Sequence, residues 1–177
     1  MTGAGEGPRH HRSRIAGIAG RLAAALCFLL ATSAQAEPRV LGWLEPITVG
    51  DAGTRLVAKL DTGAKTSSLD ATDIQPFEKN GAAWVRFGIR PQKKGAPVRI
   101  EARIIGERKI RSAVGHDERL VVELPTCIAG TKQRTQFTLS ERGGMNYRVI
   151  LGRRALEGAF AVDSARTLTT EPNCSGP

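Results

Sequence analysis

Histidine is scarce in this chain, and its scarcity excludes the commonest kind of hydrolytic metal site. Only three histidines occur among 177 residues. His10 and His11 lie near the N-terminus, which leaves His116 alone in the rest of the chain. A zinc hydrolase needs several nitrogen, sulfur or carboxylate ligands, commonly two histidines one helical turn apart in H-E-x-x-H. We therefore predict no metal site within the chain, and only a zinc ion shared between subunits stays open.

A phosphate-binding loop and an aromatic nucleic-acid platform are absent as well. The loop pattern G-x-x-x-x-G-K-[ST] needs glycine directly before its lysine, but Gly63-Ala64-Lys65-Thr66 has alanine there and no glycine at the upstream spacing. Aromatic residues make up 5% of the chain. The basic residues from Arg86 to Arg111 lack the regular aromatic interleaving of a nucleic-acid platform. These absences predict no ATP, no other cofactor and no nucleic-acid partner.

The first 36 residues have the pattern of an export signal. Arg9–Arg14 supplies a basic start, Leu22–Ala31 is an unbroken apolar stretch, and Ala34-Gln35-Ala36 is a small-x-small cleavage site. The apolar stretch is too short to span a bilayer. The alternative is an uncleaved anchor extended through Ile15, which must bury Arg21. We predict a cleaved signal peptide, a periplasmic or secreted protein, and no stable membrane span after cleavage.

Residues 37–177 have the length of one domain with a core of its own. The formal net charge of the whole chain is +9, which is compatible with acidic substrates or an anionic surface but identifies neither. Two cysteines follow the leader, Cys127 and Cys174. In an oxidising compartment they would form a disulfide that holds the C-terminal tail, and unpaired thiols are the alternative.

Short apolar segments with regularly spaced turns predict a mostly β domain. In the segment Val98–Ile105, apolar residues alternate with charged ones, as in a half-buried strand. Asn80-Gly81 is a strong signal for a tight hairpin. One short helix is predicted over Arg153–Glu157, ended by Gly158. The predicted strands, which together suggest a closed barrel, are Val40–Val49, Leu56–Asp61, Ile74–Lys79, Ala83–Ile89, Val98–Ile105, Arg119–Leu124, Arg134–Leu139 and Arg148–Leu151.

Asp61-Thr62-Gly63 is the most informative motif in the chain. It follows the mainly apolar run Leu56–Leu60, and a carboxylate that ends a buried strand needs a physical reason. In one arrangement, a tight turn on glycine lets two strands approach, and the aspartate shares a proton with a second aspartate and activates a water molecule. A plain turn is the alternative, because aspartate and glycine are common turn residues.

Further segments carry a resemblance to a known family. Ala64–Leu69 continues the motif, and Val149–Arg153 ends in two apolar residues, a glycine and an arginine. In this order the segments resemble the retropepsin-like aspartic peptidases. Lys109–Glu123 and Phe137–Arg142 resemble the bacterial branch of that superfamily, often labelled ATP-dependent zinc protease, although neither half of the label fits the residues. The resemblance runs from about Val40 to Asp163 and implies a small closed all-β barrel with one short C-terminal helix, followed by a tail over residues 164–177.

The resemblance also implies a role for each motif residue. Asp61 is expected to be the catalytic acid and base. Thr62 is expected to hydrogen-bond across a dimer, and Gly63 to allow the close approach of strands. The other positions are expected to support the turn and pack beneath it: Ala64, Ile150, Leu151 and Gly152.

The count of catalytic aspartates predicts the quaternary structure. The peptidase mechanism needs two carboxylates about 3 Å apart, and the chain has one D-T-G motif. Asp163-Ser164-Ala165 resembles D-S-G, but alanine replaces the glycine, so we take Asp163 as a structural or surface residue. An active enzyme is therefore expected to be a symmetric homodimer in which each subunit supplies one Asp61.

Ile110–Leu120 is a candidate flap over the substrate, with a plain surface hairpin as the alternative. Its possible substrate-facing residues are Arg111, Ser112, Gly115 and His116.

Viral retropepsins place an aspartate four positions after the catalytic one, where it pairs with the arginine of the late segment. Here Lys65 stands in that place and cannot pair with Arg153, so Arg153 is expected to find another carboxylate.

These observations favour an exported, homodimeric aspartic endopeptidase that acts on a peptide or protein. The alternative is a catalytically silent peptidase-fold binding module of the cell envelope. A basic envelope protein that binds anionic polymers is a third possibility, which strong salt dependence of binding without cleavage would support.

Overall fold

The computed structural model describes residues 1–3, 37–92, 95–112, 115–141 and 146–174. The chain divides into two units, Met1–Ala36 and Glu37–Pro177, and the described strands all belong to the second. Most of the predicted signal peptide lies outside the described residues. Within the described part of the chain, no helix has the length and apolar character needed to cross a membrane.

Strands dominate the second unit, and one short helix follows the ninth strand. This confirms the predicted all-β class with a single helix near the C-terminus. The described elements are β1 (Arg39–Val49), β2 (Thr54–Asp61), β3 (Ser67–Asp70), β4 (Thr72–Lys79), β5 (Ala82–Ile89), β6 (Val98–Ser112), β7 (Gly115–Ile128), β8 (Thr131–Ser140), β9 (Val149–Gly152), α2 (Arg153–Leu156) and β10 (Phe160–Thr167).

Six of the strands close into a barrel, as predicted. The sheet order is β10-β1-β2-β9-β3-β8-β7-β6-β5-β4. A further pairing between β1 and β7, from Ile47 opposite Ile128 to Val49 opposite Thr126, joins β1, β2, β9, β3, β8 and β7 in a ring. Within the ring, β2 with β9 and β3 with β8 are parallel pairs. These two pairs bring segments far apart in sequence side by side.

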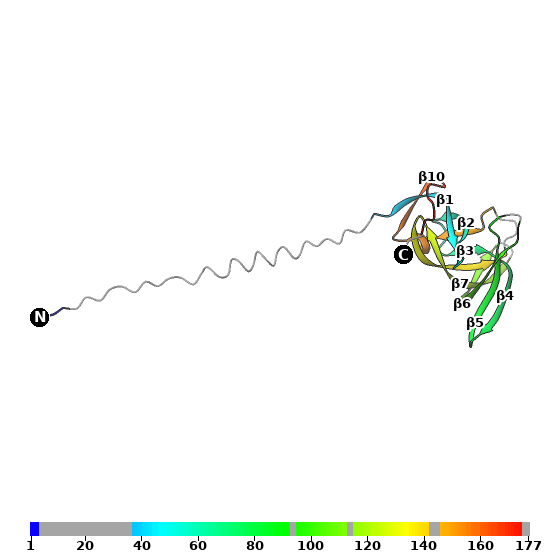
Figure 1. Cartoon of the computed structure of the whole chain (residues 1–177), viewed down its shortest axis with the longest axis horizontal. Helices are drawn as coiled ribbons and strands as arrows, with labels where there is room; N and C mark the ends of the chain where they lie inside the picture. The colour runs from blue at the N-terminus through cyan, green and yellow to red at the C-terminus, as the bar shows by residue number, and fades with distance from the viewer. Residues whose placement is uncertain (4–36, 93–94, 113–114, 142–145, 175–177) are drawn as a thin grey trace. The chain divides into compact units, whose positions relative to one another are not determined.

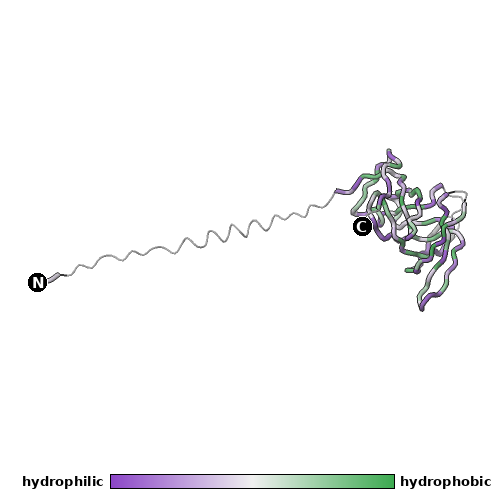
Figure 2. The backbone as a smooth tube through the Cα atoms, in the orientation of Figure 1, coloured by the Kyte–Doolittle hydropathy of each residue, from purple (hydrophilic) through white to green (hydrophobic). Residues whose placement is uncertain are grey.

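The core follows the period of two that strands impose. In β2, Leu56, Ala58 and Leu60 are buried, while Val57 between them is 45% exposed. Figure 2 shows the same alternation of hydrophobic and hydrophilic residues along the chain. The largest fully buried side chains include Phe87 of β5. Because each strand keeps one face inward, the residues that follow a strand end are held in a defined direction.

The β4–β5 hairpin extends away from the barrel (Figure 1). Its turn at Asn80-Gly81 has positive φ at both residues, 52° and 70°, as the predicted tight hairpin requires. The basic residues here do have aromatic neighbours. Lys79 lies 4.9 Å from the ring centre of Trp84, and Arg86 lies 5.2 Å from that of Phe77. These two contacts are confined to the hairpin, and the absence of a nucleic-acid partner stays a prediction.

Two strands were not predicted from the sequence. β3 reads Ser67-Ser68-Leu69-Asp70, which has no alternation, yet all four residues are buried between β8 and β9. Their polar groups are paired: the Asp70 carboxylate lies 2.7 Å from the guanidinium of Arg148.

β10, the second strand that was not predicted, contains the D-S-A segment and pairs in parallel with β1. β6 and β7 are also longer than predicted, because their exposed polar ends pair with each other rather than with the core.

The C-terminal tail is bound to the barrel. β10 continues past Asp163 to Thr167, beyond the expected end of the core. The N–H of Leu168 donates to the carbonyl of Leu44, 2.7 Å away, and Glu171 forms an ion pair with Arg55. A disulfide joins Cys174 to Cys127 of β7. The tail therefore belongs to the folded unit up to its last described residue.

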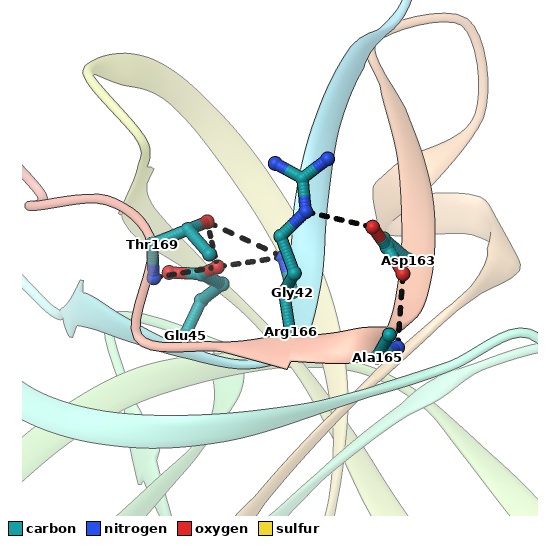
Figure 3. Close-up of polar contacts among 6 residues, drawn as sticks. All are labelled: Gly42, Glu45, Asp163, Ala165, Arg166 and Thr169. Carbon is teal, nitrogen blue, oxygen red and sulfur yellow. Dashed lines mark hydrogen bonds and ion pairs between the residues drawn. The ribbon is translucent and has the colours of Figure 1, made fainter.

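Glu45 of β1 holds this tail with a carboxylate that is 0% exposed (Figure 3). One of its oxygens accepts from the N–H of Gly42 and from the N–H and hydroxyl of Thr169. The other accepts from the N–H and hydroxyl of Thr170, each 3.0 Å away. Burial raises the pKa of Glu45, the hydrogen bonds from Thr169, Gly42 and Thr170 lower it, and the net direction is downward. The charged form is therefore the one that the fold stabilises.

Replacing Glu45 with Gln should destabilise the protein by about 2 to 3 kcal/mol, because an amide NH₂ would face donors in place of an acceptor oxygen. Chemical denaturation of the two proteins at neutral pH measures the difference. A lowered pKa in the folded state means that the carboxylate contributes stability above its usual value of 4.5 and loses it as the pH falls further.

The gap between wild type and Glu45→Gln should therefore narrow in acid. Glu78→Gln, at an exposed glutamate of β4, is the matched control and should stay within about 0.5 kcal/mol of wild type. A pH-independent gap would show that the charge of Glu45 is not what holds the tail.

Candidate active site

Asp61 is the last residue of β2, and the turn after it fixes its carboxylate. The Oδ1 atom accepts from the N–H of Gly63 at 3.0 Å and from that of Ala64 at 3.2 Å. The N–H of Ala64 also donates to the carbonyl of Asp61. Such side-chain-to-backbone bonds define a turn and hold the side chain within it. One oxygen of Asp61 is therefore occupied by the backbone of its own motif, which leaves the other for external partners.

That second oxygen faces a lysine of the same strand. The Nζ atom of Lys59 lies 3.1 Å from Oδ2 of Asp61, and the side chains are 37% and 26% exposed. The Lys59 hydrogen bond is the largest of the effects that lower the pKa of Asp61. Burial opposes it, and the N–H groups of Gly63 and Ala64 add to it. Asp61 is therefore held in its ionised form in the single chain.

Strand β9 supports the turn from the side. It runs parallel to β2, with Leu60 opposite Leu151 and Asp61 opposite Gly152. Leu151 is completely buried, whereas Ile150 is only half-buried. The chain after the motif then passes close to β9. A Cβ atom added at Gly152 would lie 2.6 Å from the carbonyl carbon and oxygen of Thr66, so only glycine fits without a shift.

Arg153, the first residue of α2, forms hydrogen bonds to the backbone of the motif. Its Nη1 atom donates to the carbonyl oxygens of Thr62, at 2.7 Å, and Gly63, at 3.0 Å. Its own N–H donates to the carbonyl of Ala64 at 2.8 Å. The expected carboxylate partner of Arg153 is thus replaced by two backbone carbonyls. No sequence signal identifies this contact, because any residue provides a carbonyl oxygen.

The structure brings Asp61, Thr62, Gly63, Ala64, Leu151 and Gly152 together, as expected, and it adds Lys59 and Arg153. The candidate flap does form a hairpin: Arg111 is paired with His116, and Ser112 with Gly115, at the far end of β6 and β7. Residues 113–114 and the side chains of residues 110–116 lie outside the described part. Their predicted contact with substrate stays a prediction.

Asp163 is engaged in contacts of its own. Its Oδ1 accepts from the N–H of Ala165 at 2.9 Å, and its Oδ2 pairs with Arg166 at 2.7 Å (Figure 3). The Ala165 N–H is the largest of the effects that lower its pKa. These contacts agree with a structural role. Among the described residues, no group of three or more His, Cys, Asp or Glu side chains is arranged to hold a metal ion.

A mainly apolar groove of about 320 Å³ adjoins the motif. It begins at Thr62 and Arg153 and continues along the end of α2 and the start of β10. Thr62 and Gly63 themselves are exposed on this side of the chain. The groove therefore offers apolar surface beside the turn that carries Asp61. Its remaining lining residues are Leu156, Glu157, Phe160, Ala161 and Val162.

Comparison with known families decides the relationship. The family model described as RimB-like, retropepsin-like aspartic endopeptidase RimB, matches residues 40–173. The chain belongs to this family. The RimB-like match includes the motif, the late β9 segment and most of the tail. It confirms the resemblance expected from the sequence.

Other similarities are partial. A solved structure, the protein Lpg0085 of unknown function from Legionella pneumophila subsp. pneumophila str. Philadelphia 1, is 33% identical with a TM-score of 0.67, over 75% of this chain and 98% of that one. A protein of Shewanella pealeana named probable alpha-L-glutamate ligase is 34% identical over 113 residues, 62% of this chain and 25% of its own. A protein of Desulfotalea psychrophila, also named probable alpha-L-glutamate ligase, is 35% identical over 111 residues, which are 61% of this chain and 24% of that protein. The chain thus spans about a quarter of the length of these curated relatives.

The Arg153 contact yields a test. Replacing Arg153 with Met removes both hydrogen bonds to the motif carbonyls, so amide hydrogen exchange at Gly63 and Ala64 should speed up roughly tenfold, equivalent to about 1.4 kcal/mol. Arg154→Met, at the exposed neighbouring arginine of α2, is the matched control and should leave both amides unchanged. Equal exchange in the two variants would mean that Arg153 does not hold the turn.

Proposed function

We propose that this RimB-like protein is an exported aspartic endopeptidase that works as a homodimer. The observation that carries the proposal is the Asp61 carboxylate. It stands at a strand end, is oriented by the N–H groups of Gly63 and Ala64, and is backed by a parallel β9 at Gly152. Membership in a family of aspartic endopeptidases supports it further.

In the proposed reaction, two Asp61 carboxylates share one proton. The ionised copy takes a proton from a water molecule, whose oxygen attacks the peptide carbonyl carbon, while the protonated copy gives its proton to the carbonyl oxygen. The resulting tetrahedral diol breaks its C–N bond as the leaving nitrogen receives a proton from the neutral carboxyl group. A diol hydroxyl gives its proton to the charged carboxylate, so the pair again holds one proton. One carboxylate must be charged and the other neutral, which close like charges enforce.

Three features support a dimer. Asp163 is occupied by Ala165 and Arg166, so it is poorly suited to serve as the second acid. Thr62 and Gly63 are exposed, as residues at a two-fold axis would be in an isolated chain. The apolar groove beside Thr62 provides surface that a partner subunit would cover.

The substrate proposed is an acidic peptide. Lys59 contacts Asp61, and Arg153 contacts the carbonyls of Thr62 and Gly63, so two cations lie at the motif. The similarity to one segment of proteins named glutamate ligases points in the same direction, toward peptides that bear glutamate. The ligase name belongs to those longer proteins, and we propose no ligase activity for this chain.

Replacing Asp61 with Asn should abolish hydrolysis of a glutamate-rich peptide, since neither proton transfer can then occur. The fold and the mass of the dimer should be nearly unchanged. A fluorogenic glutamate-rich peptide and a lysine-rich peptide of equal length measure the activity and the preference together. Turnover that persists in Asp61→Asn would refute the aspartic mechanism, and peptide binding without turnover in the wild type would favour the silent binding module.

The same variant tests the shared site. Wild-type protein mixed with excess Asp61→Asn protein, under conditions in which subunits exchange, should lose activity because mixed dimers contain one functional carboxylate. Specific activity of the wild type should also fall on dilution through the dimer dissociation constant. A monomer by sedimentation that cleaves at full rate would overturn the dimer.

Export has its own test. Expressed from the full sequence in a Gram-negative host, the protein should be recovered outside the cytoplasm with Glu37 as its first residue, because Ala34 and Ala36 form the cleavage site. Ala36→Arg should block this processing and leave a longer protein. N-terminal sequencing that finds Met1 on exported wild-type protein would favour the uncleaved anchor instead.

A further inference from the structure

Lys59 and Asp61 lie on the same face of β2, two residues apart. The buried residues Ala58 and Leu60 alternate with them, so both side chains point away from the core. The half-buried Ile150 stands opposite Lys59 on β9, and Leu44 stands opposite it on β1. Neither neighbour is charged. In this setting the lysine side chain reaches along the strand to Oδ2 of Asp61, 3.1 Å away.

Lys59 contacts Oδ2 of Asp61, the carboxylate oxygen that remains available for proton transfer. Oδ1 of Asp61 is taken by the N–H groups of Gly63 and Ala64. The proposed water or proton must therefore meet Oδ2, where Lys59 donates. A cation at hydrogen-bond distance from a carboxylate favours its charged form, and it does so more strongly for a partly buried pair than for an exposed one.

The other cations around the motif do not duplicate this contact. Arg153 directs its Nη1 atom to the carbonyls of Thr62 and Gly63 rather than to the carboxylate. Lys65 follows the turn and is exposed, and its carbonyl accepts from the N–H of Arg154. Among the described charged groups, Lys59 is therefore the one that touches Asp61 directly.

We propose that Lys59 is a positioning residue that sets the proton balance of the Asp61 pair, and thereby the pH range over which the site works. This inference rests on the proposed aspartic peptidase function. Two lysines at a two-fold axis would offset the repulsion between two carboxylates. The state with one shared proton would then exist at lower pH than it would without them.

The direction of the effect follows from the contact. Hydrogen bonding from Lys59 lowers the pKa of Asp61. Activity requires one proton on the pair, so lowering both titration steps moves the bell-shaped pH profile toward acid. Removing the lysine should move the profile toward neutral pH. A merely structural lysine would change stability or overall rate and leave the position of the profile unchanged.

The first experiment measures the carboxyl group itself. The protein is labelled with ¹³C at the aspartate carboxyl carbons, the Asp61 signal is assigned by its loss in Asp61→Asn, and its titration is followed in wild type, Lys59→Met and Lys59→Arg. Asp61 should titrate at higher pH in Lys59→Met and near the wild-type value in Lys59→Arg. Lys79→Met, which breaks a lysine–carboxylate pair with Glu101 in another part of the sheet, is the matched control and should leave Asp61 unchanged.

The second experiment measures the pH dependence of kcat/KM on the glutamate-rich peptide for the same proteins. The maximum should move toward neutral pH in Lys59→Met alone. Equal titration of Asp61 in wild type and Lys59→Met would overturn the inference whether or not the protein cleaves peptides. Absence of cleavage in every protein, together with a shifted titration in Lys59→Met, would instead refute the peptidase function and retain the role of Lys59 in the ionisation of Asp61.

Discussion

The close parallel pairing of β2 with β9 is the constraint on which the site depends. Asp61 stands opposite Gly152, and the chain after the motif passes so near β9 that a Cβ atom at Gly152 would meet the Thr66 backbone at 2.6 Å. Because the two strands end together, α2 starts next to the turn and Arg153 can reach its carbonyls. The barrel closes through the pairing of β1 with β7, and this closure keeps β2 beside β9. The barrel therefore determines the direction of the Asp61 carboxylate.

Three acids of this domain illustrate how context decides what a carboxylate can do. Glu45 is fully buried and surrounded by donors from the tail, so it is a structural anchor. Asp163 binds Ala165 and Arg166 within its own strand. Asp61 forms a similar turn with Gly63, but its second oxygen is reached by a side chain on the open face of β2. Only in the third case does the carboxylate stand at the end of a barrel strand, beside a turn that a second barrel strand and Arg153 hold in place.

The sequence predicted the parts of this structure whose patterns are local. The Asn80-Gly81 turn and the alternation in Val98–Ile105 predicted strands correctly, and the D-T-G motif and Gly152 lie opposite each other where β2 and β9 end. β3 was not predicted, because its buried polar side chains are paired with residues distant in sequence, such as Arg148 with Asp70. The same holds for Arg153, whose partners are backbone carbonyls, and for Glu45, whose donors come from a tail more than a hundred residues away. Contacts of this kind depend on the closed barrel and have no local signature.

The disulfide between Cys127 and Cys174 places one half of the site inside a covalent ring. The two cysteines are 47 residues apart, and the segment between them contains β8, β9, α2 and β10. A ring of this size restricts the unfolded chain enough to favour folding by about 4 kcal/mol in the chain-entropy account. Gly152 and Arg153 lie within the ring, whereas Asp61 lies outside it. In a reducing compartment the unfolded chain would regain that freedom in the segment that supports the carboxylate, so the stability of the folded site is linked to where the protein resides.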